Sequence, residues 1–445
     1  MNWFGSFRRK DKKTQSEFKI RNFGRFSDAF KPAEKYLFWE ESLVLFDKGK
    51  RFSAFQLFFK YLSNEKENNI KVSQIHGVMD FEMIQGSKKI IGSINAQTIH
   101  CQATLATKSE FPSALLLELL QENYNLKFCK FALAATPKGE KDLVLIADLP
   151  AKTTSPYKLY YVLRELALAA DKKDDLIFSK YGLEGPFYQA LHEPIAEHVQ
   201  DVYFDYIQSV FRKVIVAKAE GAIDVTRYPS AYRYLLLAAV YKLDFLVRPQ
   251  GYLMDQFEKM DAMAFSSQTN DPVKDNQRIE AIVEEILLLP KDEVLKELYR
   301  THATFGFNPV IQSAQIRDTI YSELPTMDWY LENEYMDYAV AIVDFIVGYL
   351  LFNFIVPPPC KALFLLYYRI REDHFFKDLG YVDVVFRDQR LLPTPIKKEV
   401  KKVIRGYDKE FPYLTAPVFM LSFKSEANFC KTYLEMIAEI NFTRK

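Results

Sequence analysis

Hydrophobic positions change their period along the first half of the chain, and each change predicts an element. An amphipathic helix is indicated by apolar residues at helical spacing: Phe55, Phe58, Phe59 and Leu62. Between residues 70 and 106 the period shortens to two, interrupted by turn-forming residues at 85–87. Because β-branched residues are frequent from Ile90 to Leu105, this interval predicts three antiparallel strands.

A second helix and a hairpin follow the predicted strands. Leucines return to helical spacing after Pro112, and asparagines at 123–125 can end that helix in the left-handed conformation. Two apolar stretches, 128–134 and 143–149, then flank the sequence Thr-Pro-Lys-Gly at 136–139. Proline presets φ and glycine accepts positive φ, so this arrangement predicts a hairpin.

A third helix is expected to begin at Ser155 and Pro156, because serine caps helices and proline suits their first turn. The charged run Asp-Lys-Lys-Asp-Asp at 171–175 is expected to close this helix in solvent. Glycine and proline between residues 182 and 186 then mark a boundary.

From about residue 187 onward the pattern is helical throughout. Proline and glycine separate the predicted helices, which span 189–219, 229–246, 271–289, 291–303, 328–356, 360–372, 396–406 and 425–440. The predicted fold class is α+β, with an antiparallel-sheet module of element order α-β-β-β-α-β-β-α followed by a large all-α domain. The predicted domains are an N-terminal arm with a short helix (1–50), the α+β module (51–182) and the helical domain (187–445).

Three stretches of the α+β module carry a resemblance to a known fold: DFEMIQGSKKIIGSI, LLLELLQENYNLKFCKFAL, and LVLIADLP followed by SPYKLYYVLREL. On these stretches, residues 52–175 resemble the type III secretion chaperone-like fold, in particular its YbjN-like bacterial branch. The resemblance implies a non-catalytic module whose relatives hold secretion substrates or peptide segments, often as dimers. The helical region resembles no family that we recognise.

Composition limits the class of protein. A net charge of +1 over 445 residues provides no overall attraction to nucleic acid or to a membrane surface. The cysteines are far apart and match neither a CxxC motif nor a zinc-ligand spacing: Cys101, Cys129, Cys360 and Cys430. The first 13 residues place aromatic residues before basic ones, the reverse of a signal peptide. These features predict a reduced, cytoplasmic protein.

One stretch, residues 339–356, is apolar and about long enough to cross a bilayer. Asp344 and Asn353 interrupt it, and acidic rather than basic residues precede it. The stretch is therefore predicted to be a buried core helix.

Candidate chemistry is sparse. His192 and His198 are six residues apart, with Pro194 between them, so they diverge on a helix and do not form a metal-binding pair. His76 and His100 could pair across neighbouring strands, although surface or structural roles are favoured. The chain has no phosphate-binding loop and no nucleophile elbow. We therefore predict no catalytic residue, no cofactor and no metal site.

The distribution of charge indicates where a partner could dock. The interval from Asp318 to Cys360 contains no lysine or arginine, whereas the predicted helix 396–406 is strongly basic. Four of its lysines form a basic ridge at helical spacing: Lys397, Lys398, Lys401 and Lys402. The ridge either keeps its helix soluble or docks a protein partner or a second copy of the chain. Aromatic residues do not alternate with it, so nucleic-acid binding is not predicted.

The N-terminal arm combines aromatic and basic side chains: Trp3, Phe4, Phe7, Arg8 and Arg9. This combination is typical of segments that contact anionic lipid or a protein partner, but the arm is too short for stable anchoring alone.

Together these patterns favour a non-catalytic protein-binding, chaperone-like or scaffold function, with a protein or peptide partner and with a homodimer as one form. Two alternatives stay open. One is an enzyme whose site lies in the helical domain around Asp344, Asn353 or His374, because buried polar groups in an apolar helix are candidate site residues. The other is peripheral membrane association through the N-terminal arm.

Overall fold

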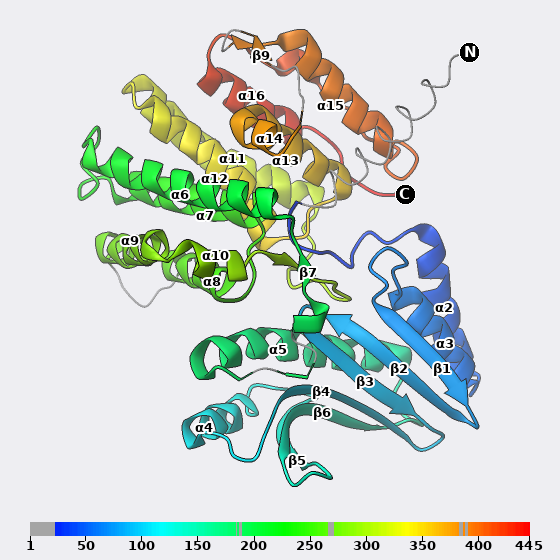
Figure 1. The fold of residues 1–445 in the computed structure, drawn as a ribbon. Helices are drawn as coiled ribbons and strands as arrows, with labels where there is room; N and C mark the ends of the chain where they lie inside the picture. The colour runs from blue at the N-terminus through cyan, green and yellow to red at the C-terminus, as the bar shows by residue number, and fades with distance from the viewer. Residues whose placement is uncertain (1–22, 184, 187–188, 266–270, 382–385, 388–389) are drawn as a thin grey trace, which may run out of the picture. The chain divides into compact units, whose positions relative to one another are not determined.

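A computed structural model describes residues 23–445 except 184, 187–188, 266–270, 382–385 and 388–389 (Figure 1). The chain forms two compact units. The α+β unit comprises Phe26–Pro194 and Tyr299–Phe307, and the helical unit comprises Met1–Arg25, Ile195–Leu298 and Asn308–Lys445. An antiparallel six-stranded sheet and a large helical region are both present, which confirms the predicted fold class.

The main sheet of the α+β unit is antiparallel and six-stranded, with strand order β1-β2-β3-β4-β6-β5. Its strands are β1 (Ile70–Ile75), β2 (Val78–Gln85), β3 (Lys88–Ile94), β4 (Thr98–Lys108), β5 (Lys130–Ala135) and β6 (Lys141–Pro150). The predicted turn at 85–87 joins β2 to β3, and the predicted hairpin at 136–139 joins β5 to β6. Both predictions are confirmed.

Four strands, rather than the predicted three, precede the second helix of the module, and β1 is the additional one. Its side chains are nearly all exposed, with Val72 at 41% and Ile75 at 62%. Apolar and polar residues alternate only from Ile70 to Ser73, and Gln74 then breaks the pattern, so the period-two signal of this edge strand is short. His76 and Gly77 both have positive φ, as a two-residue turn of type I′ requires, and they connect β1 to β2.

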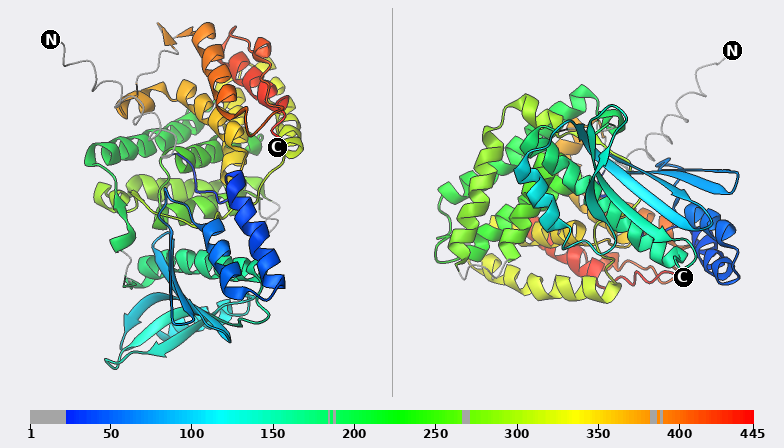
Figure 2. Two further views of the ribbon diagram at one scale, coloured as in Figure 1. Left: turned by 90° about the vertical axis from the view of Figure 1, so that its right-hand side faces the viewer. Right: turned by 90° about the horizontal axis from the view of Figure 1, so that it is seen from below.

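The helices of this unit are α2 (Ala33–Asp47), α3 (Arg51–Leu62), α4 (Ser113–Glu122) and α5 (Pro156–Tyr181). Helices α2 and α3 lie side by side at the β1 end of the sheet (Figures 1 and 2). The predicted phenylalanine stripe of α3 is buried, as are Leu115 and Leu119 of α4.

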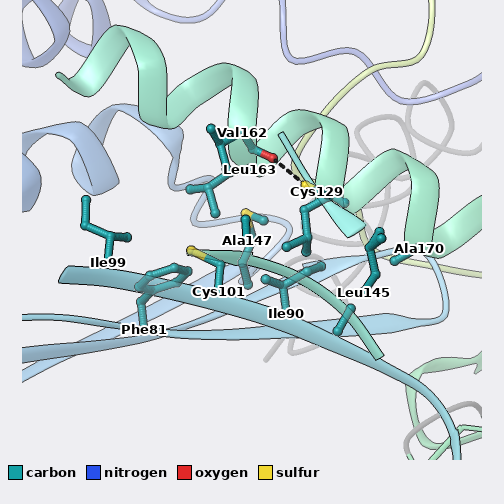
Figure 3. Packing of buried hydrophobic residues seen from close by; sticks show 14 of the residues in the cluster. Phe81, Ile90, Ile99, Cys101, Cys129, Leu145, Ala147, Val162, Leu163 and Ala170 are labelled. Atoms are coloured by element: carbon teal, nitrogen blue, oxygen red, sulfur yellow. Dashed lines mark hydrogen bonds between the residues drawn. The ribbon is translucent and has the colours of Figure 1, made fainter. Parts of the chain in front are cut away.

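The core of the unit lies between one face of the sheet and α5. Figure 3 shows Phe81, Ile90 and Leu145 of the sheet pointing toward Val162 and Leu163 of the helix. Side chains on the opposite face of β2, β3 and β4 are exposed or half-buried. One face of the sheet is therefore covered by helices, and the other face has a polar, accessible surface.

The charged run at 171–175 corrects the sequence-based prediction. Helix α5 continues through it to Tyr181, and three residues of the run are buried rather than solvated: Asp171, Lys173 and Asp174. Lys172 is exposed, as expected. Asp174 Oδ1 lies 2.6 Å from Lys88 Nζ, and Lys173 Nζ lies 3.4 Å from Glu118 Oε1. Partners from β3 and α4 neutralise these charges, and local sequence cannot indicate partners that are so distant along the chain.

The helical unit contains eleven helices among its described residues: α6 (Glu197–Ala219), α7 (Pro229–Leu246), α8 (Gly251–Phe265), α9 (Pro272–Leu288), α10 (Lys291–Lys296), α11 (Ser313–Glu332), α12 (Met336–Asn353), α13 (Pro358–Arg371), α14 (Asp373–Asp378), α15 (Pro393–Tyr407) and α16 (Glu426–Ala438). A short strand pair, β9 (Phe386–Arg387) with β10 (Arg390–Leu391), precedes α15. Helix α8 and most of α11 were not predicted, because Gly251 was interpreted as a break and Pro325 interrupts the pattern of α11.

Helix α12 corresponds to the apolar stretch predicted as a core helix. It is long and apolar enough to cross a membrane by composition, and 78% of it is buried inside the structure. Gly24 and Arg25 belong to the same unit, since Gly24 N–H donates to Phe245 O at 2.7 Å and Arg25 Nη2 lies 2.9 Å from Asp244 Oδ1.

The observed units are not contiguous along the sequence. Residues 299–307, which lie inside the predicted helical domain, belong to the α+β unit, and so does the segment from Phe26 to residue 50. The predicted helix 291–303 ends early, at Lys296, and β8 (Tyr299–Arg300) pairs with β7 (Glu193–Pro194) instead.

Candidate polypeptide-binding surface of the α+β unit

The α+β unit already holds one extended stretch of its own chain, residues 299–307. The stretch begins with β8, which pairs with β7. Two residues after β8, Gly86 N–H donates to His302 O at 2.8 Å. Arg164 Nη2 donates to the carbonyl oxygens of Gly306 at 3.0 Å and Phe307 at 3.3 Å. The backbone of residues 299–307 is therefore hydrogen-bonded by residues of the α+β unit that are more than 100 positions away in the sequence.

Two side-chain amides also bind this stretch. We call the residues that hold it the cradle: Asn69, Gln85, Gly86, Tyr160 and Arg164. Gln85 Oε1 accepts hydrogen bonds from the backbone N–H groups of Thr304 at 3.1 Å and Phe305 at 3.0 Å. Asn69 Nδ2 donates to Thr304 Oγ1 at 3.0 Å. Phe305 is fully buried and meets the ring of Tyr160 edge-on, with centroids 5.3 Å apart. Satisfied backbone groups and one buried aromatic anchor are what holding an extended polypeptide requires.

The edge strand β1 offers a second such position that no described strand occupies. Ile84 N–H donates to Asn69 O at 2.9 Å, which makes Asn69 and Ile84 a hydrogen-bonded pair. Bonded and non-bonded pairs alternate in an antiparallel ladder. By this alternation Ser73 is bonded to β2, whereas Val72 and Gln74 direct their N–H and C=O groups away from β2.

Two hollows flank β1, one on each face of the sheet. On the open face a hollow of about 590 Å³ extends from Lys71 and Ser73 across β2 and β3 to His100 of β4. On the helix-covered face a hollow of about 430 Å³ lies between β1 and α3, with Phe59, Ile70 and Val72 in its lining. A strand added at this edge would therefore have space for its side chains on both faces.

The open face is polar and its charges are partly neutralised. His100 Nδ1 lies 2.7 Å from Asp148 Oδ1, and Lys89 Nζ lies 3.2 Å from Glu82 Oε2. Asp80 is exposed and has no ion-pair partner among the residues that the structure describes. His76, which could have paired with His100, instead lies in the β1–β2 turn.

A buried polar cluster fixes the β2–β3 turn to α5. Ser87 Oγ donates to Asp174 Oδ2 at 2.7 Å, and Ser87 N–H donates to Asp171 Oδ1 at 3.1 Å. Gly86 has φ of +55°, and a Cβ there would lie 1.7 Å from Asp171 Oδ1. Only glycine allows the turn to approach the carboxylate this closely.

Burial raises the pKa of Asp171 to about 6, against the opposing effect of the hydrogen bond from Ser87 N–H. The folded unit consequently binds this proton more tightly than the unfolded chain. The stability that the proton contributes is fully present below about pH 4 and is lost as the pH rises through 6.

The Asp171→Asn variant is therefore expected to be more stable than the parent protein at pH 8, with the difference shrinking toward pH 4. From about 1.4 kcal/mol per pKa unit, the change over this range is about 3 kcal/mol. Urea unfolding at several pH values measures it, and the exposed-turn variant Glu140→Gln is the control for loss of a carboxylate. A difference that does not vary with pH would contradict the assignment.

The residues of the predicted basic ridge lie on α15. Ile396 and Val400 are buried on its inner face, while Lys398, Lys401 and Lys402 are exposed. Lys402 Nζ lies 3.1 Å from Glu399 Oε2, and Lys397 Nζ lies 5.7 Å from the centroid of the Phe423 ring. A docking role for the ridge stays a prediction. The predicted contacts of the arm, Trp3, Phe4, Phe7, Arg8 and Arg9, lie outside the described residues.

The three side chains considered for an enzyme site do not converge. Asp344 is buried but bonded, since Tyr367 Oη donates to its Oδ1 at 2.6 Å and Lys242 Nζ lies 3.0 Å from its Oδ2. Asn353 Nδ2 donates to Asp261 Oδ1 at 3.3 Å. His374 is exposed on α14. The structure therefore assigns Asp344 to an ion-pair network.

Histidine and cysteine side chains also form no metal centre in the described part of the chain, where no group of three or more His, Cys, Asp or Glu residues has suitable geometry. His192 stacks on Tyr299 with centroids 3.7 Å apart, and burial lowers its pKa to about 4. All four cysteines are buried as free thiols.

No known family model matches the chain, and a comparison with curated proteins finds no relative. The features that bear on function are therefore the edge of β1 with its two hollows and the contacts of residues 299–307. Sequence patterns indicated neither the contacts of residues 299–307 nor the open edge of β1, although Gln85 and Gly86 were identified as turn residues.

Proposed function

We propose that the α+β unit is a non-catalytic, chaperone-like module that binds an extended segment of a partner polypeptide as an added strand beside β1. One observation carries the proposal: the outward N–H and C=O groups of Val72 and Gln74 lie between two hollows that can take alternate side chains. An edge strand with unpaired backbone groups is a template for such pairing.

The cradle around residues 299–307 supports this proposal, because the same unit binds extended backbone through both main-chain and side-chain groups. Each net backbone hydrogen bond contributes about 0.5–1.5 kcal/mol, and association has an entropic cost of several kcal/mol. A short segment is therefore expected to bind weakly unless its side chains also fill the hollows.

Replacing Val72 with proline is expected to weaken binding by up to about tenfold while the fold is retained. Proline removes the outward N–H donor, and edge strands tolerate it where that N–H does not face the sheet. The probe is a fluorescent heptapeptide, Thr-Val-Arg-Val-Glu-Val-Thr, and binding to the full-length protein is measured by anisotropy. Unchanged affinity in Val72→Pro would count against strand addition.

Two controls make the test specific. Val72→Thr keeps both the donor and the side-chain shape, so it should bind like the parent protein. Ser73→Pro should instead destabilise the unit, because its N–H faces β2. Hydrogen exchange gives an independent readout: the amides of Val72 and Gln74 should exchange rapidly in the free protein and become protected when peptide binds, whereas Ser73 should already be protected.

A further inference from the structure

We infer that the segment held at β1 is selected by its charge order: a basic residue opposite Ser73, an apolar residue opposite Val72 and an acidic residue opposite Lys71. The inference rests on the proposed addition of a strand at β1 and specifies the chemistry of the partner. It follows from two rows of side chains that cross the strands and end at β1. The row that ends at Ser73 is acidic, and the row that ends at Lys71 has a basic outer end.

The first row continues inward from Ser73. The strand register aligns Ser73, Asp80, Ser93, His100 and Asp148 across the open face of the sheet. Asp80 stands between two serines, and Asp148 is 58% exposed. The row thus contains two carboxylates and neither lysine nor arginine, and the small side chain of Ser73 leaves Asp80 accessible from the edge.

A residue opposite Ser73 would lie two strand spacings from Asp80, each about 4.8 Å. The long stem of arginine or lysine can cross Ser73 and place its cation beside Asp80, within the 590 Å³ hollow. A short or acidic side chain at that position would leave Asp80 unpaired or face it with like charge.

The second row begins at Lys71 and has a positive charge at the edge of the sheet. The register aligns Lys71 with Glu82, Ile91 and Gln102. Glu82 already lies 3.2 Å from Lys89, which stands in the neighbouring row opposite Ile84. The row itself therefore has one paired carboxylate and a cation, Lys71, at its outer end. Opposite charges are favoured directly across a strand pair, and an acidic neighbour therefore suits Lys71.

Val72 lies between Lys71 and Ser73, and its side chain points to the helix-covered face of the sheet. Val72 is paired with Phe81, whose ring is buried against Phe59 with centroids 4.6 Å apart. The hollow beside Val72 includes Phe59 and Ile70, which favours an apolar side chain there. Because every strand pair in this sheet is antiparallel, we assign the added strand the antiparallel direction, and its order is then basic, apolar, acidic.

Two heptapeptides of identical composition test this order: Thr-Val-Arg-Val-Glu-Val-Thr and Thr-Val-Glu-Val-Arg-Val-Thr. The first is expected to bind the full-length protein about tenfold more tightly than the second, since the exchange converts two attractive cross-strand pairs into two repulsive ones. Asp80→Asn should reduce this ratio to about threefold, and Asp80→Lys should reduce it further by favouring the second peptide. Glu140→Gln, a charge change in the β5–β6 turn, should leave the ratio unchanged.

The outcomes separate this inference from the proposed function. Equal affinity of both peptides, with binding still weakened in Val72→Pro, overturns the charge order and leaves strand addition supported. A preference for the second peptide overturns the antiparallel assignment. If neither peptide binds, both proposals are overturned. A tenfold ratio that persists in Asp80→Lys also overturns the role of Asp80.

Discussion

Replacing Lys88 with methionine is expected to lower the free energy of unfolding of the α+β unit by about 3–5 kcal/mol. Lys88 is 2% exposed, and its Nζ lies 2.6 Å from Asp174 Oδ1, which is itself fully buried. Removing the ammonium takes away the cation that pairs with this buried carboxylate, which also accepts a hydrogen bond from the Ser87 hydroxyl. An uncompensated buried charge is among the largest single-site penalties known for proteins.

The double variant Lys88→Met, Asp174→Asn is the control, and it should recover more than half of the loss because the carboxylate beside the lost ammonium is then uncharged as well. Tryptophan fluorescence can report each unit separately. Trp39 packs against Tyr61 in the α+β unit, with centroids 5.0 Å apart, and Trp329 stacks on Tyr335 in the helical unit. With Trp3 and Trp329 replaced by phenylalanine, a Trp39 unfolding midpoint that does not move in Lys88→Met would contradict the prediction.

Replacing Asp344 with alanine is expected to destabilise the helical unit by a similar amount, about 3–5 kcal/mol. Asp344 Oδ2 lies 3.0 Å from Lys242 Nζ, and its Oδ1 lies 3.7 Å from Arg371 Nε and accepts the hydroxyl of Tyr367. The substitution removes the carboxylate that lies between Lys242 and Arg371 in a region where α12 is almost entirely buried. Lys242 then keeps only its second acidic neighbour, Glu372, at 2.6 Å among the ion pairs of the described residues.

Tyr367→Phe is the graded comparison, since it removes one hydrogen bond to a charged acceptor and should cost only about 1.5–3 kcal/mol. The measurement is urea unfolding followed by Trp329, with Trp3 and Trp39 replaced. If Asp344→Ala proved no more harmful than Tyr367→Phe, the carboxylate would not be the centre of this network. An enzymatic role for Asp344 would then need to be examined again.

Local signals in the sequence predicted those elements whose stability is decided locally. The Phe55 stripe defines α3, the turn at 136–139 defines the β5–β6 hairpin, and Pro156 begins α5. In each case the residues that specify the element are its own, and they agree with its burial pattern.

Features whose burial depends on residues far away in the sequence could not be predicted from local patterns. The charged run at 171–175 was taken for a solvated helix end, because Lys88 and Glu118 neutralise it from 55 residues away or more. Strand β1 has only a short alternation of apolar and polar residues, and both of its faces are largely exposed. The hollows beside it, and the outward N–H of Val72, exist only once β1 has paired with β2, so no local motif could indicate the candidate site.

The position of residues 299–307 in the α+β unit has a consequence for synthesis on the ribosome. Phe26–Pro194 emerges first, yet Phe305, which fills the core, and Thr304, which satisfies Asn69 and Gln85, follow only after the whole stretch Ile195–Leu298 has been translated. Until then the nascent unit has a vacant cradle for extended backbone, and a foreign strand present at that stage would compete with the native one for the same polar groups. Translation rate across 195–307 should accordingly influence the yield of correctly folded protein.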